Sequence, residues 1–224
     1  MTQLPLDLGH RTAFGRADFL VAPCNEAAVA WLDRWPNWPG PALALCGPPR
    51  SGKTHLSEVW RARAGAVMIE PRDLASATVA ERLAGRRAAV VDDADAADEE
   101  ALLHLYNLLA ERRGHLLIVA AEPPARWRIA LPDLRSRLLA APAVAVEPPD
   151  EAVLGAVLVK LFADRQLAIG EDVIPYLLVQ LERSFAAAEA AVDALDAASL
   201  AEARAITVPL ARQVLTRLAG RGPG

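Results

Sequence analysis

Residues 47–54 read Gly-Pro-Pro-Arg-Ser-Gly-Lys-Thr, a G-x-x-x-x-G-K-T pattern whose residue types suit a chain of phosphates. An apolar run at 42–46 precedes it and a helical pattern follows, so we expect a strand, a glycine-rich turn and a helix. Glycines let backbone N–H groups turn inward, the helix N-terminus is positive, and a lysine adds a full charge. A glycine-rich turn that binds nothing is the alternative. The predicted phosphate-binding residues are Gly47, Pro48, Arg50, Ser51, Gly52, Lys53, Thr54 and His55.

Two acidic residues, Asp92 and Asp93, close a second apolar run at 88–91. In a parallel sheet the carboxyl ends of the strands meet at one edge, where the phosphate loop also lies. Asp92, together with the Thr54 hydroxyl, can then hold Mg²⁺ through water, and Asp93 can orient a hydrolytic water. Acids that only start a loop or cap the next helix are the alternative. The phosphate loop favours the magnesium interpretation.

Arg135 and Arg137 stand two residues apart in a helical pattern at 132–139, so they point in different directions. One can face solvent while the other faces a neighbouring molecule. An arginine that reaches a γ-phosphate across an interface raises the hydrolysis rate by orders of magnitude. The spacing alone favours two solvated arginines, since charged side chains usually lie on the surface. It also does not say whether Arg135 or Arg137 would reach the neighbouring nucleotide.

Near the N-terminus, Gln3, Leu4, Leu6 and Leu8 belong to a short amphipathic peptide with leucines at alternate positions. An extended peptide of this kind can lay its leucines in an apolar groove while the glutamine makes directed hydrogen bonds. The leucines can equally pack back on their own domain. Composition does not choose between these two interpretations.

The order of elements predicts an α/β fold, because strand patterns alternate with helical patterns up to residue 148. Strands are expected at 42–46, 67–69, 88–91, 115–119 and 144–146. Asn25 is expected to cap a first helix, and further helices are expected at 53–64, through 102–109 and at 132–139. We therefore predict a parallel five-stranded sheet with flanking helices. Beyond residue 148 only helical segments follow, at 150–165, 171–181, 183–203 and 207–219. The predicted parts are an arm at 1–20, an α/β domain at 21–148 and a small all-helical lid at 149–224.

Composition excludes several classes of protein. The 224 residues carry a formal net charge of −4, which argues against a basic surface for duplex DNA. Nucleic acid, if involved, is then reached through a partner. Cys24 and Cys46 form neither a disulfide framework nor a metal-ligand pattern. No apolar run spans a bilayer and the polar start is no secretory signal, so we expect no membrane association and a reducing cytoplasm.

Together these residues resemble the replication-initiator family of AAA+ proteins over nearly the whole chain. More narrowly they resemble its short Hda-type members, homologues of DnaA that lack its DNA-binding domain. Residues 3–8 look like that family's peptide for the replication sliding clamp. Residues 47–54 are similar to its Walker A loop, 90–93 to its Walker B strand, and 132–138 to its arginine-finger motif, with Arg137 at the finger position.

The resemblance implies a negative regulator of replication initiation. Such a protein holds ADP or ATP with Mg²⁺, and it binds the DNA-loaded sliding clamp, the β subunit of DNA polymerase III. It contacts ATP-bound DnaA, where Arg137 completes a shared site and promotes hydrolysis. Duplex DNA is reached only through the clamp, and self-association into a homo-oligomer is compatible with the family.

Two positions depart from the family pattern. Ala120 and Ala121 stand where the family often has a polar sensor near the γ-phosphate. Ala186 stands where the lid usually has an arginine that contacts nucleotide. Arg183 lies one turn earlier and can substitute, because residues three apart share a helical face. Both changes weaken the hydrolysis expected of the chain itself, whereas the intact loop preserves binding.

Other functions remain open from the residues alone. A self-sufficient P-loop ATPase, acting as a motor or loader subunit, needs efficient hydrolysis without partners. A clamp-tethered scaffold would use nucleotide only to stabilise its fold. A DNA-binding initiator is disfavoured by the acidic charge balance and by the absence of a recognition helix.

Overall fold

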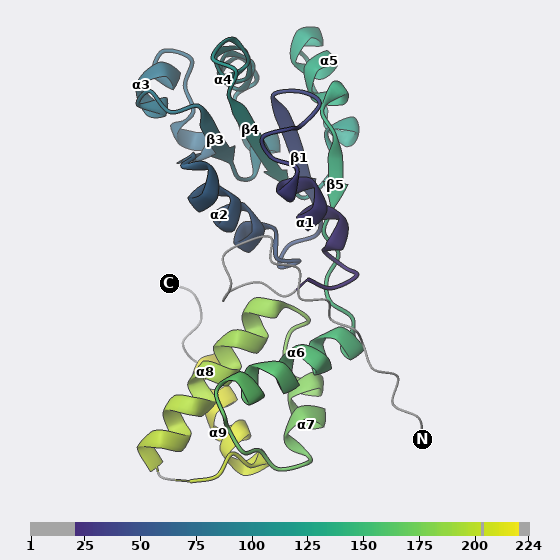
Figure 1. Ribbon diagram of the computed structural model, residues 1–224, viewed down its shortest axis with the longest axis vertical. Coiled ribbons are helices and arrows are strands. Elements are labelled where there is room, and N and C mark those ends of the chain that lie inside the picture. The colour runs from purple at the N-terminus through teal and green to yellow at the C-terminus, as the bar shows by residue number, and fades with distance from the viewer. Residues whose placement is uncertain (1–20, 203, 220–224) are drawn as a thin grey trace. The chain divides into compact units, whose positions relative to one another are not determined.

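The computed structural model describes residues 21–202 and 204–219 of the chain, which divide into two compact units (Figure 1). The first extends to residue 147 and the second begins at residue 148. The predicted clamp peptide, with Gln3, Leu4, Leu6 and Leu8, lies outside the described residues.

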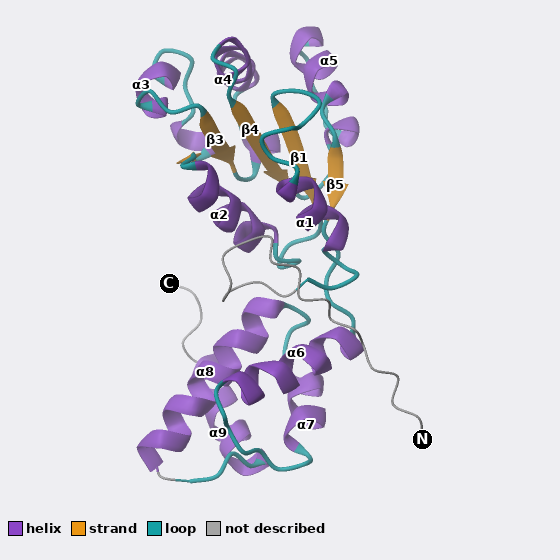
Figure 2. Cartoon of the chain, viewed as in Figure 1, coloured by secondary structure: helices purple, strands orange, loops and turns teal. Residues whose placement is uncertain are grey.

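The first unit is built on a five-stranded sheet in the order β2-β3-β4-β1-β5, in which every pairing is parallel. Parallel neighbours need crossover connections, and helices supply them (Figure 2). The predicted α/β class, with a parallel five-stranded sheet and flanking helices, is confirmed. The strands are β1 Ala42–Cys46, β2 Val67–Ile69, β3 Ala88–Val91, β4 His115–Ala120 and β5 Ala143–Ala145.

Helices cover both faces of this sheet, and side-chain alternation along β1 shows how. Leu43 and Leu45 pack with α1 (Glu26–Asp33) and α2 (Lys53–Ala64). Ala42, Ala44 and Cys46 face the opposite layer. Because both faces are covered, β1 is buried along its whole length, which explains its uninterrupted apolar sequence. The second layer consists of α3 Val79–Leu83, α4 Glu99–Glu111 and α5 Pro132–Ala140.

Some local expectations need correction. Asn25 does occupy the position before α1, but its side chain makes no hydrogen bond to the helix. Its Oδ1 instead accepts from the Ala22 amide at 2.9 Å, and the residue is buried. Ala22 O in turn accepts from the amides of Asn25 and Glu26. The Asn25 side chain therefore closes the turn that precedes α1. The fifth strand begins and ends one residue earlier than expected, within the ordinary uncertainty of ladder ends.

The sequence did not predict the shortest helical elements of the first unit. Helix α3 has five residues, too few for a helical repeat of apolar positions to show. Three single turns of 3₁₀ helix were also unpredicted: η1 Pro71–Asp73, η2 Ala94–Ala96 and η3 Pro124–Arg126.

The second unit is helical, as expected from residue 149 onward. The Asp150 carboxylate caps its first helix by accepting from the Val153 amide at 2.7 Å. One isolated parallel bridge joins Ile169 to Ile206. Among the residues that the structure describes, no helix is long and apolar enough to cross a membrane. The helices are α6 Glu151–Asp164, α7 Val173–Gln180, α8 Phe185–Glu202 and α9 Val208–Ala219.

Candidate nucleotide-binding site

The phosphate loop leaves the carboxyl end of β1 and enters α2, as the pattern predicted. Gly47 is required by close packing, since a Cβ there would lie 2.1 Å from the backbone oxygen of Val146. Gly52 has φ +102°, a left-handed conformation that favours glycine. These two glycines shape the curve of the loop. The first amides of α2 then point into it without intrahelical partners, which makes this end suitable for an anion.

Lys53 is folded over the loop it belongs to. Its Nζ donates to Gly47 O at 2.7 Å and to Pro48 O at 2.8 Å. Its side chain is buried, and this burial lowers the pKa of its ammonium, although Asp92 and Asp93 act in the opposite direction. The charge is thus held at the centre of the loop by two carbonyl oxygens, which a phosphate group can replace as partners.

The two predicted metal-binding groups do meet. Thr54 Oγ1 donates to Asp92 Oδ2 at 3.3 Å, and Asp92 Oδ1 accepts from the Asp93 amide at 3.0 Å. Asp93 has φ +48°, in the left-handed region, and its side chain is exposed. The hydrogen bond from the Asp93 amide orients the Asp92 carboxylate toward the first turn of α2.

The residues present fit a nucleotide phosphate chain with Mg²⁺. Ser51 is buried, and its Oγ has no hydrogen-bond partner among the described residues, so the loop retains an unsatisfied polar atom. No group of three or more His, Cys, Asp or Glu side chains in the described part of the chain could hold a metal ion. A hydroxyl and one carboxylate therefore need phosphate oxygens and water to complete an octahedral magnesium site.

The end of β4 lies beside the loop but offers it no polar side chain at the positions predicted for a sensor. The Gly47 amide donates to Ala120 O at 3.3 Å and to Ala121 O at 3.2 Å. Glu122 follows directly, and its carboxylate accepts from Arg126 at 2.8 Å on an exposed part of the surface. Sequence reasoning missed the Glu122–Arg126 pair, for which the spacing of four residues was the available signal.

The two arginines of α5 differ in their surroundings. Arg137 is half-buried, its Cζ lies 5.5 Å from the centre of the Tyr106 ring, and its Nη2 lies 3.7 Å from Asp133 Oδ2. Arg135 is exposed and makes no hydrogen bond or ion pair with the described residues. Burial raises the pKa of Tyr106, whereas the neighbouring Arg137 acts to lower it.

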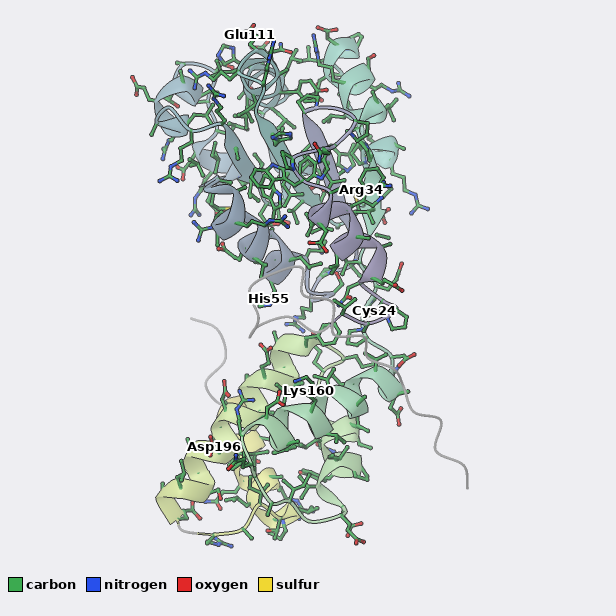
Figure 3. All side chains as sticks on the ribbon, viewed as in Figure 1. Cys24, Arg34, His55, Glu111, Lys160 and Asp196 are labelled. Atoms are coloured by element: carbon green, nitrogen blue, oxygen red, sulfur yellow. The ribbon has the colours of Figure 1, made fainter. Side chains whose placement is uncertain are left out.

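Arg137 packs on the middle of α4. Tyr106 stands seven residues into α4, about 10 Å along the helix from its start near the carboxyl edge of the sheet. Figure 3 shows Glu111, at the far end of α4, and His55, in the first turn of α2, at opposite ends of this unit. Arg137 thus contacts α4 about two turns beyond the start of that helix.

In the second unit, Arg183 lies just before α8 and is exposed. Its Nη2 lies 3.6 Å from Glu151 Oε2. Ala186, in the first turn of α8, is also exposed. The predicted contact of Arg183 with nucleotide stays a prediction, and it requires this ion pair to open.

One feature near α5 was missed by sequence reasoning. The Glu99 carboxylate accepts from the amides of Ala130 at 2.9 Å and Leu131 at 2.8 Å. The sequence predicts only that Glu99, as an acidic residue, favours the N-terminus of a helix. No local signal predicts a contact with residues more than thirty positions away.

Comparison with known proteins gives the same architecture. Residues 152–215 match the model of the Hda lid domain. Domain III of the Thermotoga maritima replication initiation protein DnaA is similar at 18% identity, with a TM-score of 0.67, over 89% of this chain and 94% of that chain.

Two further structures share the fold. A replication initiator DnaA bound to AMPPCP and single-stranded DNA is 18% identical over 80% of this chain, with a TM-score of 0.63. This chain spans 63% of that one. A point mutant of Thermotoga maritima RuvB is 14% identical, with a TM-score of 0.60. The match covers 79% of this chain and 61% of the RuvB chain. The fold is that of AAA+ proteins with a helical lid.

Proposed function

We propose that this chain, an Hda-type AAA+ protein, is a negative regulator of DNA replication initiation that stimulates ATP hydrolysis by DnaA. The observation that carries the proposal is the Hda lid domain at 152–215, joined to a unit with the fold of a DnaA AAA+ domain. An Hda-type lid distinguishes this protein among P-loop proteins that share the general fold.

The phosphate loop is proposed to hold ADP or ATP. Support comes from the position of Lys53 at the centre of the loop and from the start of α2, where Gly52 makes no side-chain capping bond. Thr54 and Asp92 are the residues that would hold Mg²⁺, whose charge would neutralise the phosphates. Arg50, His55 and Arg183 remain proposed contacts of the nucleotide.

Arg137 is proposed to act on the nucleotide of a neighbouring DnaA. Its aromatic partner is Tyr106, about two turns into α4, and not a residue of the phosphate loop, which agrees with action in trans. A guanidinium aimed at the γ-phosphate stabilises the charge that develops during hydrolysis, and such an arginine contributes roughly 10³–10⁵ in rate. Arg137 would thus supply a group that the DnaA site lacks.

The leucine-containing peptide at 3–8 is proposed to bind the sliding clamp. Its support is the sequence itself, in which Gln3 is followed by leucines at alternate positions, Leu4, Leu6 and Leu8. Clamp binding would bring the regulator to newly copied duplex DNA without a DNA-binding surface of its own.

An assay of DnaA ATP hydrolysis, with and without DNA-loaded clamp, tests the proposal. The intact chain should stimulate hydrolysis when the loaded clamp is present. Arg137→Ala should abolish stimulation and leave clamp binding unchanged, whereas Arg135→Ala is the matched control that should retain stimulation. Gln3→Ala combined with Leu4→Ala should remove the dependence on the clamp. Equal stimulation by Arg137→Ala and the intact chain would refute the assignment.

The intact set of Lys53, Thr54, Asp92 and Asp93 also favours a second function, a self-sufficient ATPase in a loader or motor. The apolar Ala120 and Ala121 beside the loop weigh against it. Turnover of ATP by the purified chain without partners separates the two functions, since only the second requires it.

A further inference from the structure

Arg137 is restrained mainly by the face of an aromatic ring. Its Cζ lies 5.5 Å from the centre of the Tyr106 ring, within the distance of a cation–π contact. Its Nε is fully covered, yet no hydrogen bond holds it within the described part of the chain. The ion pair with Asp133 is long, at 3.7 Å, and exposed, so it contributes little. Tyr106 is therefore the principal restraint.

This contact leaves the side chain partly accessible, since 37% of the Arg137 side chain is exposed. Among the described residues, the terminal N–H groups of Arg137 are engaged only by the long ion pair with Asp133, and such groups bind phosphate oxygens. An arginine already ordered in this way loses less conformational freedom when it engages a phosphate. Arg135, which is exposed and makes no such contact, lacks this advantage.

A second contact fixes the helix that carries the arginine. Glu99 Oε1 accepts from the Ala130 amide at 2.9 Å and Oε2 accepts from the Leu131 amide at 2.8 Å. Leu131 is the residue immediately before α5. Both oxygens of one carboxylate thus hold the start of α5, and charge-assisted bonds of this kind are stronger than neutral ones.

Apolar packing also holds α5, since Leu134 and Leu138 are buried in the same core cluster as α4. A cavity of about 310 Å³ lies here, and its lining includes Glu99, Leu102, Trp127 and Leu134. Side chains leave this space unfilled between the beginning of α4 and the segment that leads into α5. Beside this space, the hydrogen bonds of Glu99 hold the two residues that precede α5.

Glu99 and Tyr106 act from one face of one helix. They are seven residues apart on α4, close to two full turns, so they lie on the same side. Helix α4 holds α5 at its beginning through a carboxylate and near its end through a ring. Because Glu99 and Tyr106 both belong to α4, these two contacts restrain both the position and the direction of α5.

We propose that α4 positions the reaching arginine: Tyr106 seats the Arg137 guanidinium, and Glu99 fixes the start of α5. Both are positioning residues, because neither touches the nucleotide of DnaA. The inference rests on the proposed function of Arg137 and identifies it, rather than Arg135, as the arginine prepared to reach. The inference adds Glu99 and Tyr106 to the residues on which the stimulated rate of DnaA hydrolysis depends.

Variants at Tyr106 test the proposal through the stimulated DnaA hydrolysis rate. Tyr106→Phe retains the aromatic face and should keep the maximal stimulated rate within about twofold. Tyr106→Leu removes the face and should lower the maximal rate by roughly tenfold, with the half-maximal concentration of regulator changed far less. Tyr176→Leu is the matched control, because Tyr176 packs similarly on Arg212, at 6.0 Å, in the second unit.

Glu99→Gln tests the second contact. The amide keeps one acceptor and loses the other, so the maximal rate should again fall, by about tenfold or less. Nucleotide affinity and the helical circular dichroism of the variant should match those of the intact chain, which would show that the fold survives. Retention of the rate by Tyr106→Phe, but not by Tyr106→Leu, distinguishes positioning from a general loss of structure.

A measurement on the chain alone separates this proposal from the proposed function. The Nε–H resonance of Arg137, assigned with the Arg137→Ala variant, should carry a ring-current shift that Tyr106→Leu removes and Tyr106→Phe preserves. If Arg137→Ala abolishes stimulation while a folded Tyr106→Leu retains the full maximal rate, the positioning role is overturned and the function stands. If Arg137→Ala leaves stimulation intact, the proposed function fails, and the resonance still decides whether the ring seats the guanidinium.

Discussion

The hydroxyl of Thr54 lies 3.3 Å from Oδ2 of Asp92, although 38 positions separate the two residues in the chain. One belongs to the first turn of α2 and the other directly follows β3. A parallel sheet brings these two segments to the same edge, so a hydroxyl and a carboxylate meet beside the phosphate loop.

Removal of the Asp92 charge should weaken nucleotide binding only when magnesium is present. Asp92→Asn keeps the size of the side chain but loses an ionised oxygen, and we expect about a tenfold loss of affinity for Mg-ATP. Affinity measured in excess chelator should change little. Asp95→Asn, in the adjacent exposed turn, is the control and should behave as the intact chain. Equal losses with and without magnesium would contradict the assignment.

Chemical labelling offers a direct test at Lys53. The chain has two lysines, Lys53 and Lys160, so one protein carries both the probe and its internal control. Bound ADP should replace the loop carbonyls as partners of the Lys53 ammonium and slow its reaction with an amine-reactive ester. Lys160, paired with Asp164 on α6, should react at the same rate with and without ADP. Peptide mass spectrometry measures both rates, and an unprotected Lys53 would argue against binding at this loop.

Gly47→Ala should destabilise the first unit. The new methyl group would lie 2.1 Å from the backbone oxygen of Val146, and backbone cannot move aside as a flexible side chain can. Overpacking of this kind costs about 1–3 kcal/mol of the free energy of unfolding. Gly40→Ala provides the control, because nothing lies within 4 Å of the added atom. Thermal unfolding should show a lower melting temperature for Gly47→Ala alone.

The stability of the first unit should fall as the medium becomes more acidic than about pH 6.5. His115 packs between Trp35 and Trp38, and burial lowers the pKa of its imidazole below the ordinary 6.5. The unfolded chain therefore binds a proton more readily, and stability is lost as pH falls through the folded-state pKa. The hydrogen bond from Nε2 to Pro36 O, at 3.0 Å, opposes this shift only in part.

Urea unfolding followed by tryptophan fluorescence measures this effect. The stability advantage of the intact chain over His115→Gln should be greater at pH 7.5 than at pH 5.5. A constant difference across this range would show that His115 titrates alike in the folded and unfolded states.

Helix capping should stabilise the second unit at Asp150 more than at Asp172. Asp150 accepts from the Val153 amide, whereas Asp172, at the same position before α7, makes no side-chain capping bond. We expect Asp150→Ala to lower the free energy of unfolding by about 1 kcal/mol and Asp172→Ala to lower it by less. Denaturant unfolding followed by circular dichroism compares the two variants. Equal losses would mean that the capping bond is not what stabilises α6.

Much of the fold could be predicted because its signals are local. The apolar runs that form β1 and β4 are continuous, and glycine, lysine and threonine stand next to one another at the phosphate loop. Helix α3 could not be predicted, because five residues show no period. The role of Asn25 was misread for a related reason: its polar side chain can cap a helix or close a turn, and the burial of that turn decided between them.

The sequence by itself determined the phosphate loop, the alternation of strands and helices, and the helical character of the second unit, because each depends on neighbours along the chain. Tertiary structure alone decided that Thr54 meets Asp92, that Glu99 holds the amides before α5, and that Arg137 rather than Arg135 lies on Tyr106. Each of these contacts joins separate elements, and their distances depend on how helices pack on the two faces of the sheet. No spacing within a single element carries that information.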